Sequence, residues 1–93
     1  MENDKGIKIK ATDDVLKGTY ANNVLISHTG GEFLLDFMML FPPQGILGAR
    51  VIVSPGHAKR MVKALQENIA RYEQKFGTIL EAEIPKADGG TIH

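Results

Sequence analysis

Apolar side chains recur at three- and four-residue steps between residues 54 and 77, which is the clearest pattern in the chain. The apolar stripe consists of Ala58, Met61, Val62, Leu65, Ile69, Tyr72 and Phe76. This spacing predicts one amphipathic helix. Ser54 is a suitable N-cap, Pro55 fits the first helical position, and Gly77 is suited to end the helix. We expect no second helix in the chain.

Alternation with a period of two residues predicts a β-hairpin before the helix. Its first strand covers residues 19–28, and a Thr-Gly-Gly turn follows. Its second strand covers residues 32–41. There every odd position is apolar, and the even positions after Glu32 are apolar except for Asp36. A strand that is apolar on both sides is typical of the centre of a sheet with both faces covered.

A loop and a third strand are predicted between the hairpin and the helix. Pro42 and Pro43 interrupt the alternation, which favours a loop over residues 42–48. The strand pattern resumes over residues 49–53. The loop then exposes two aliphatic side chains, and we treat it as a candidate docking loop formed by Ile46 and Leu47.

The two ends of the chain carry weaker patterns. Residues 7–10 alternate isoleucine with lysine, which fits either a short edge strand or a disordered basic arm. Residues 78–84 fit a further short strand or a docking arm. We therefore predict an N-terminal arm at residues 1–18, a single α+β domain at residues 19–84, and a flexible tail at residues 85–93.

Together these elements predict an α+β fold, with an antiparallel sheet of three to four strands and one long C-terminal helix packed on one face. One helix covers only one face of the sheet. Three even-numbered side chains of the central strand then need a second cover, because leaving them in water forfeits roughly 1.5–3 kcal/mol each. A second copy supplies that cover symmetrically. We predict a homodimer or a higher even oligomer whose interface contains Leu34, Met38 and Leu40.

Composition narrows the classes of function. The chain has 93 residues and no cysteine, which excludes disulfides and thiolate metal sites. Lysine and arginine total 11, as do aspartate and glutamate, and this balance argues against non-specific binding to nucleic acid or anionic membranes. The polar first residues and the short apolar runs predict a cytoplasmic protein without a signal peptide or a membrane span.

Asp36, His28 and His57 are the residues most suited to chemistry. An acid inside an apolar strand fits a general base or a metal ligand, but a structural role is commoner, in which Asp36 pairs with Arg50 on the neighbouring strand or accepts backbone N–H groups. The two histidines, with Glu32, show no spacing typical of metal ligands. A small metal-dependent enzyme is therefore the third choice of function, and no catalytic, metal or cofactor site is predicted.

A group of basic residues near the start of the predicted helix is a candidate anion or nucleic-acid patch. Tyr20 and Phe41 could add stacking surfaces, as in proteins that bind single strands. The alternative is an ordinary solvated helix face, and no strand alternates basic with aromatic residues. The patch consists of Arg50, Lys59, Arg60 and Lys63.

Several short motifs resemble one known family. They are Tyr20-Ala21-Asn22, Glu32-Phe33-Leu34-Leu35-Asp36-Phe37, Asn68-Ile69, Tyr72-Glu73 and Phe76-Gly77. Over residues 19–77 the chain is similar to domain of unknown function 3467, a family of small bacterial and archaeal proteins. It departs from the usual pattern in the loop at residues 42–48 and in the tail. The resemblance implies a cytoplasmic prokaryotic protein and supplies no catalytic residues.

The function we expect is that of a non-enzymatic, homo-oligomeric binding or accessory module. It would act by binding an unidentified protein partner, without a cofactor. The alternative is a single-stranded nucleic-acid-binding or regulatory protein that uses the basic patch.

Overall fold

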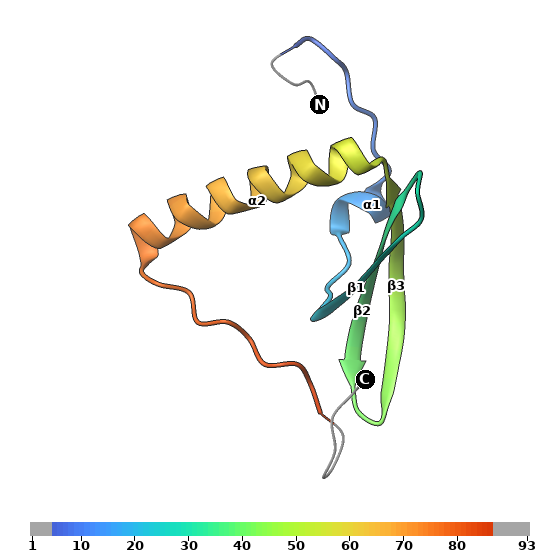
Figure 1. Ribbon diagram of the computed structural model, residues 1–93, viewed down its shortest axis with the longest axis vertical. Coiled ribbons are helices and arrows are strands. Elements are labelled where there is room, and N and C mark those ends of the chain that lie inside the picture. The colour runs from blue at the N-terminus through green and yellow to red at the C-terminus, as the bar shows by residue number, and fades with distance from the viewer. Residues whose placement is uncertain (1–4, 87–93) are drawn as a thin grey trace.

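The computed structural model describes residues 5–86. Its sheet is antiparallel, with the strand order β1-β2-β3, so β2 is central (Figure 1). This confirms the predicted α+β fold of a three-stranded antiparallel sheet followed by a long C-terminal helix. The elements in chain order are α1 (Asp13–Lys17), β1 (Asn23–His28), β2 (Phe33–Phe41), β3 (Gln44–Val53) and α2 (Pro55–Phe76).

The β1–β2 hairpin forms where the sequence predicts it, but β1 begins at Asn23 rather than at residue 19. Just before this start, the side chain of Asn22 takes the place of a ladder residue. Its Nδ2 donates to the carbonyl oxygen of Leu40 at 2.9 Å, and its Oδ1 accepts from the Leu40 N–H at 2.7 Å. The amide side chain therefore satisfies the Leu40 peptide groups that a longer β1 would otherwise pair.

The connection between β2 and β3 corrects the sequence analysis, because the predicted loop at residues 42–48 is wrong. Pro42 and Pro43, joined by a cis peptide bond, form the whole turn, and β3 begins at Gln44. Prolines are tolerated here because turn positions need no ladder N–H. Gly48 is the extra residue of a bulge opposite the step from Phe37 to Met38.

The position of Gly48 is also crowded by a neighbouring segment. A Cβ atom at this residue would lie 2.8 Å from the Cγ2 of Thr19, closer than side-chain atoms normally approach. A glycine therefore lets the segment before β1 pass close to the bulge in β3.

Both ends of α2 follow the prediction. The Oγ of Ser54 accepts from the N–H of His57 at 3.1 Å, and Pro55 lies in the first turn. Gly77 ends the helix with φ of 97°, a value that glycine adopts without steric cost, and its N–H donates to the carbonyl oxygen of Glu73.

The prediction of a single helix is wrong, because α1 forms one short turn before β1. Thr12 caps it by accepting from the N–H of Val15 at 3.3 Å. Asp13 and Asp14 in its first turn complement the partial positive charge of a helix N-terminus.

The remaining segments of the described chain form no further strand. Within residues 7–10 only Lys8 shows a single ladder pairing, so the edge strand is not formed. Residues 78–84 are irregular, with Ile79 donating its N–H to the Glu73 carboxylate at 2.8 Å. The tail predicted at residues 85–93 lies mostly outside the described residues.

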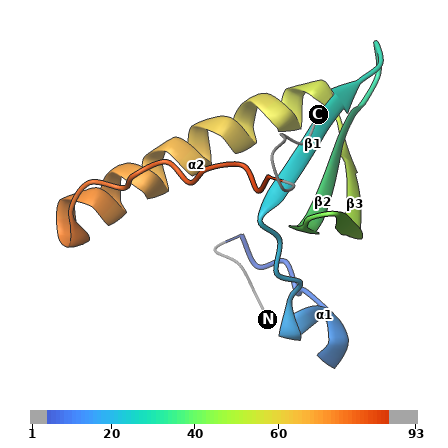
Figure 2. The same ribbon diagram turned by 90° about the horizontal axis from the view of Figure 1, so that it is seen from below.

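The helix α2 does not lie along a face of the sheet in the single chain. It leaves the end of β3 and runs outward, so that only its first turns approach the strands (Figures 1 and 2). Extensive contacts between the described elements are confined to the two pairs of neighbouring strands. Ser54 alone separates β3 from α2, and the direction of the chain at this junction carries the later turns away. The cover that we expected over one face is thus not supplied by the chain itself.

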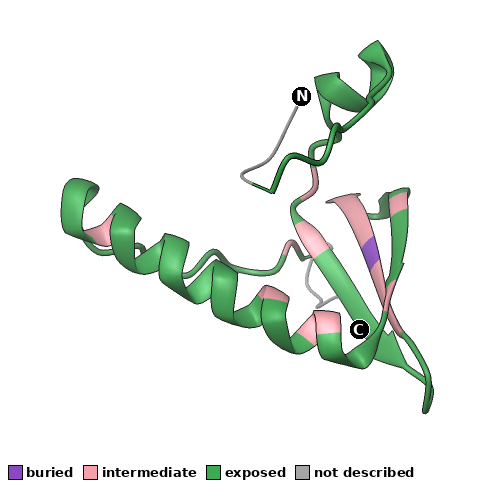
Figure 3. Ribbon diagram, turned by 90° about the horizontal axis from the view of Figure 1, so that it is seen from above, coloured by how far each residue is buried: buried purple, intermediate pink, exposed green. Residues whose placement is uncertain are grey.

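As a result, the described residues form no apolar core. Asp36 is buried, at 7% exposure, and no hydrophobic residue is (Figure 3). The radius of gyration is 16.3 Å, whereas a compact chain of this length has a radius of about 12 Å. The single chain is an open arrangement of a sheet and a helix.

Candidate functional site

One face of the sheet is apolar across all three strands. Residues that lie directly opposite one another in neighbouring strands project to the same side. From the register, the face that carries the odd-numbered residues of β2 is interrupted only by His28 and Gln44 at its ends. We call it the apolar face, and it consists of Val24, Ile26, Phe33, Leu35, Phe37, Met39, Phe41, Ile46, Ala49, Val51 and Val53.

The opposite face of the sheet mixes polar and apolar side chains. It contains the predicted interface residues Leu34, Met38 and Leu40, which are half-buried, and Leu47 of the predicted docking loop. We call it the mixed face, and it consists of Asn23, Leu25, Ser27, Leu34, Asp36, Met38, Leu40, Leu47, Arg50 and Ile52.

An ion pair lies at the centre of the mixed face. The Nε of Arg50 donates to Oδ1 of Asp36 at 2.7 Å, and Nη2 donates to Oδ2 at 2.9 Å. The hydrogen bonds from Arg50, with its positive charge, hold the pKa of Asp36 below its ordinary value, although burial acts in the opposite direction. Asp36 is thus paired with Arg50, one of the two structural roles that the sequence suggested for it.

The helix α2 presents a second unpaired apolar surface. Beyond its first turns, Val62, Leu65, Ile69, Tyr72 and Phe76 are each between 40% and 65% exposed. Tyr72 and Phe76 contact one another, with ring centroids 4.9 Å apart. We call the apolar stripe of this helix the α2 stripe, and it consists of Ala58, Met61, Val62, Leu65, Ile69, Tyr72 and Phe76.

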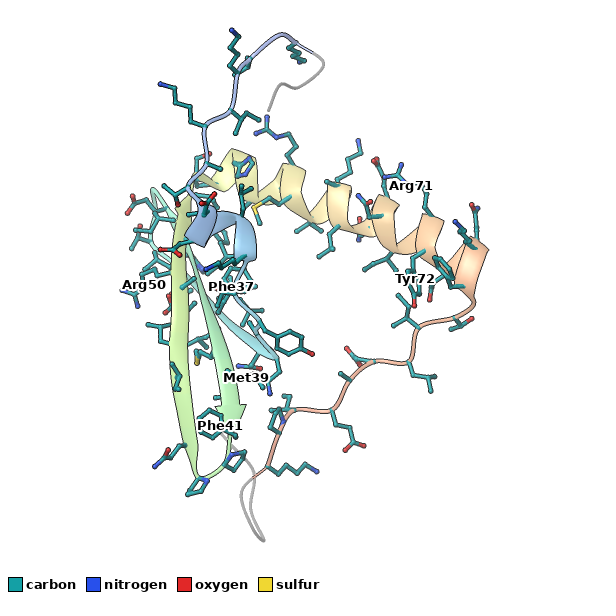
Figure 4. The ribbon with its side chains drawn as sticks, turned by 180° about the vertical axis from the view of Figure 1, so that it is seen from behind. Phe37, Met39, Phe41, Arg50, Arg71 and Tyr72 are labelled. Atoms are coloured by element: carbon teal, nitrogen blue, oxygen red, sulfur yellow. The ribbon has the colours of Figure 1, made fainter. Side chains whose placement is uncertain are left out.

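The apolar face and the α2 stripe border the same open angle of the molecule. Figure 4 shows Phe37, Met39 and Phe41 on the side of the sheet toward α2, and Tyr72 on the side of α2 toward the sheet. Arg71 points away from that angle, and Arg50 lies on the other side of the sheet. The apolar face and the α2 stripe therefore face the same side of the molecule without extensive contact between α2 and the strands.

The candidate docking residues lie in β3 rather than in a loop. Ile46 pairs with Met39 and so belongs to the apolar face, whereas Leu47 pairs with Met38 on the mixed face. Both remain exposed, at 59% and 54%. They project to opposite sides of the sheet, so they do not form one contact spot.

The structure brings together only three members of the predicted basic patch. Lys59, Arg60 and Lys63 lie in the first half of α2, where all three are exposed. Arg60 is hydrogen-bonded to His57, with 2.6 Å between its Nη2 and the Nδ1. Arg50 lies on the mixed face and is paired with Asp36.

The residues of the third-choice metal site do not converge. His28 stacks on Phe33, with ring centroids 5.2 Å apart, while His57 bonds to Arg60 in α2. Across residues 5–86 no group of three histidine, aspartate or glutamate side chains is arranged to hold a metal ion.

Sequence reasoning identified the apolar character of Phe37 and its odd-numbered neighbours but assigned their cover to the chain's own helix. That assignment directed attention to the even-numbered residues of β2 as the interface. A periodic pattern marks which side chains need a cover. It carries no signal for the direction in which a helix leaves its strand.

Comparison with known families gives one match. The model of the family described as protein of unknown function, DUF3467, matches residues 1–81. The chain belongs to the DUF3467 family. The match confirms the resemblance seen in the motifs and extends it to the N-terminal arm of this DUF3467 protein. No curated protein and no solved structure matches the chain. In the part of the DUF3467 chain that the structure describes, neither helix combines the length and apolarity needed to span a bilayer.

Proposed function

We propose that this DUF3467 protein is a homo-oligomeric accessory module that acts by binding protein. The observation that carries the proposal is that none of the hydrophobic residues within residues 5–86 is buried. Burial of apolar surface is the dominant favourable term in folding. A short chain that lacks a core needs another source of burial, and without cysteine a disulfide framework is excluded.

The amount of exposed surface supports association between chains. The chain exposes 8291 Å², whereas a compact protein of 10.2 kDa exposes about 5300 Å². The excess of about 3000 Å² is larger than the roughly 1000–2500 Å² that each subunit contributes to an obligate homodimer. A second copy thus offers enough surface to complete the fold.

The protein partner is proposed to bind the assembled oligomer. Ile46 and Leu47 lie next to the Pro42-Pro43 turn, at one end of the β2–β3 hairpin, and both are exposed. Because the two side chains lie on opposite faces of the sheet, each offers a separate small apolar contact to a partner rather than a shared one.

Sedimentation velocity and light scattering at several protein concentrations test the oligomer. We expect a mass of two chains or a higher even number, and we expect the thermal unfolding midpoint to rise with protein concentration, because association stabilises by mass action. A folded species with the mass of one chain at every concentration would refute the proposal.

A second candidate function, binding to single-stranded nucleic acid, is favoured only by the exposure of Lys59, Arg60 and Lys63 on α2. Titration of a labelled oligonucleotide at low salt tests it. Phosphate contacts weaken steeply as salt rises, so salt-dependent binding would support this function and no binding at low salt would remove it.

A further inference from the structure

We propose that α2 of one chain lies on the apolar face of a second copy, and that the second copy returns its own α2 in the same way. The inference rests on the proposed homo-oligomer and adds which two surfaces meet. It makes the DUF3467 dimer an exchange of helices between two otherwise incomplete folds.

The junction at Ser54 is the first reason. Ser54 both links β3 to α2 and caps the helix through the N–H of His57, so no flexible connection remains that would let α2 turn back over its own sheet. Along α2, His57, Ala58 and Met61 in the first turns and Glu73 near the end are half-buried, and the other residues of the helix are exposed. Tyr72, farther along the α2 stripe, lies on the side of α2 toward the apolar face (Figure 4).

The two surfaces match in chemistry and in length. A helix of 22 residues is about 33 Å long, and strands of 9 and 10 residues are about 31 Å and 34 Å long. The apolar face carries no Asp, Glu, Lys or Arg among its register positions, and neither does the α2 stripe. The two surfaces that would meet therefore contain no Asp, Glu, Lys or Arg side chain of their own.

The same argument selects the apolar face over the mixed face. An α2 stripe placed on the mixed face would cover the ion pair between Asp36 and Arg50, and removing a charged pair from water is costly. An α2 stripe placed on the apolar face leaves this ion pair uncovered, and the charged side of α2 stays in water. That side carries Lys59, Lys63, Glu67, Arg71 and Lys75.

A second copy is the occupant because this one chain supplies both partners of the contact. Each copy offers one apolar face and one α2 stripe, so a twofold axis satisfies both at once and closes the assembly. The two reciprocal contacts would cover part of the exposed area by which the single chain exceeds a compact protein of its mass.

Cross-linking between single-cysteine variants tests the exchange, because the natural chain has no cysteine. Met39→Cys places a thiol on the apolar face, and Ile69→Cys places one on the α2 stripe. The two variants carry tags of different mass, are mixed, unfolded and refolded together, and are treated with a short bis-maleimide. We expect a cross-linked product that contains one chain of each.

The matched control is Arg71→Cys, two residues from Ile69 but directed away from the open angle in Figure 4. Mixed with Met39→Cys, it should give several-fold less of the mixed product. Val51→Cys, on the same face in β3, replaces Met39→Cys if that variant does not reach the parent's mass and circular dichroism.

A chain with both Met39→Cys and Ile69→Cys separates the alternatives. Excess cysteine-free protein should dilute its cross-linking if α2 is exchanged. An undiminished cross-link within one chain would overturn the exchange, while an oligomeric mass would leave the proposed function standing. An oligomer with neither cross-link would also overturn the exchange. A monomeric mass would remove both proposals.

Discussion

At the scale of single residues, the pairing of Asp36 with Arg50 places two charges inside an otherwise apolar strand pair. From sequence, pairing with Arg50 was one of two structural roles suggested for Asp36, and the register places the two residues opposite one another. The role of Asn22 was not predicted. Its side chain bonds Leu40, 18 residues away, and nothing in the local pattern marks a polar residue that substitutes for a peptide group.

The Asp36–Arg50 pair predicts a pH dependence of stability. The pKa of Asp36 is lowered in the folded protein, so its contribution is complete above the ordinary carboxyl range of about 4 and is lost as the pH falls toward the folded pKa. Urea midpoints measured at a fixed protein concentration from neutral to acidic pH should therefore decline. Asp36→Asn should lower the midpoint at neutral pH and flatten that decline.

The other carboxylates also titrate in this pH range, so the experiment needs a control variant at a different carboxylate. Asp14→Asn is a suitable control, because the Asp14 contact with Lys17 at 3.8 Å is almost fully exposed and surface pairs of this kind contribute little. If Asp36→Asn and Asp14→Asn give the same pH profile, the pair does not act as described.

At the scale of elements, the ends of α2 were predictable and its direction was not. Ser54, Pro55 and Gly77 are local signals, and the structure confirms each of them. The start of β3 was missed because Pro42 and Pro43 suggest a loop wherever they occur, whereas here they fill the two turn positions of a tight hairpin. Local signals therefore predicted where α2 begins and ends, but they predicted neither the direction of α2 nor the start of β3.

The Ser54 cap gives a prediction at this scale. Ser54→Ala removes the acceptor for the His57 N–H and should lower the free energy of unfolding by about 1 kcal/mol. Ser54→Asp retains an acceptor at the same place and should lie close to the parent. Chemical denaturation of the three proteins at one concentration measures the difference, and equal midpoints for Ala and Asp would show that the cap contributes nothing.

At the scale of the whole molecule, the exposed α2 stripe and the apolar face are the two surfaces on which the proposed oligomer rests. The sequence predicted a sheet that needs a cover on both sides, whereas the structure has one apolar face and one mixed face. Which side is covered, and by which chain, depends on tertiary geometry at Ser54 that no periodic pattern contains. For that reason Leu34, Met38 and Leu40 were selected as the interface from sequence, and Phe37 and Met39 from structure.

Ile69→Asp tests the whole-molecule interpretation. Each buried isoleucine is worth about 1.5–3 kcal/mol, and a reciprocal dimer contains two, so the dissociation constant should rise by roughly a hundredfold or more. Sedimentation equilibrium of parent and variant measures this change. Arg71→Asp, on the charged side of α2, is the matched control and should leave the dissociation constant within a few-fold. Equal effects of the two variants would contradict burial of the α2 stripe.

The order of the elements has a consequence for how the protein is made. The sheet leaves the ribosome before α2 does. If the helix that covers this sheet belongs to another chain, folding to the native state is bimolecular. Its rate then depends on how many sister chains are being translated nearby. At low expression, newly made chains would spend longer exposed to chaperones and proteases, so the cell would hold little of this protein until synthesis passed a threshold.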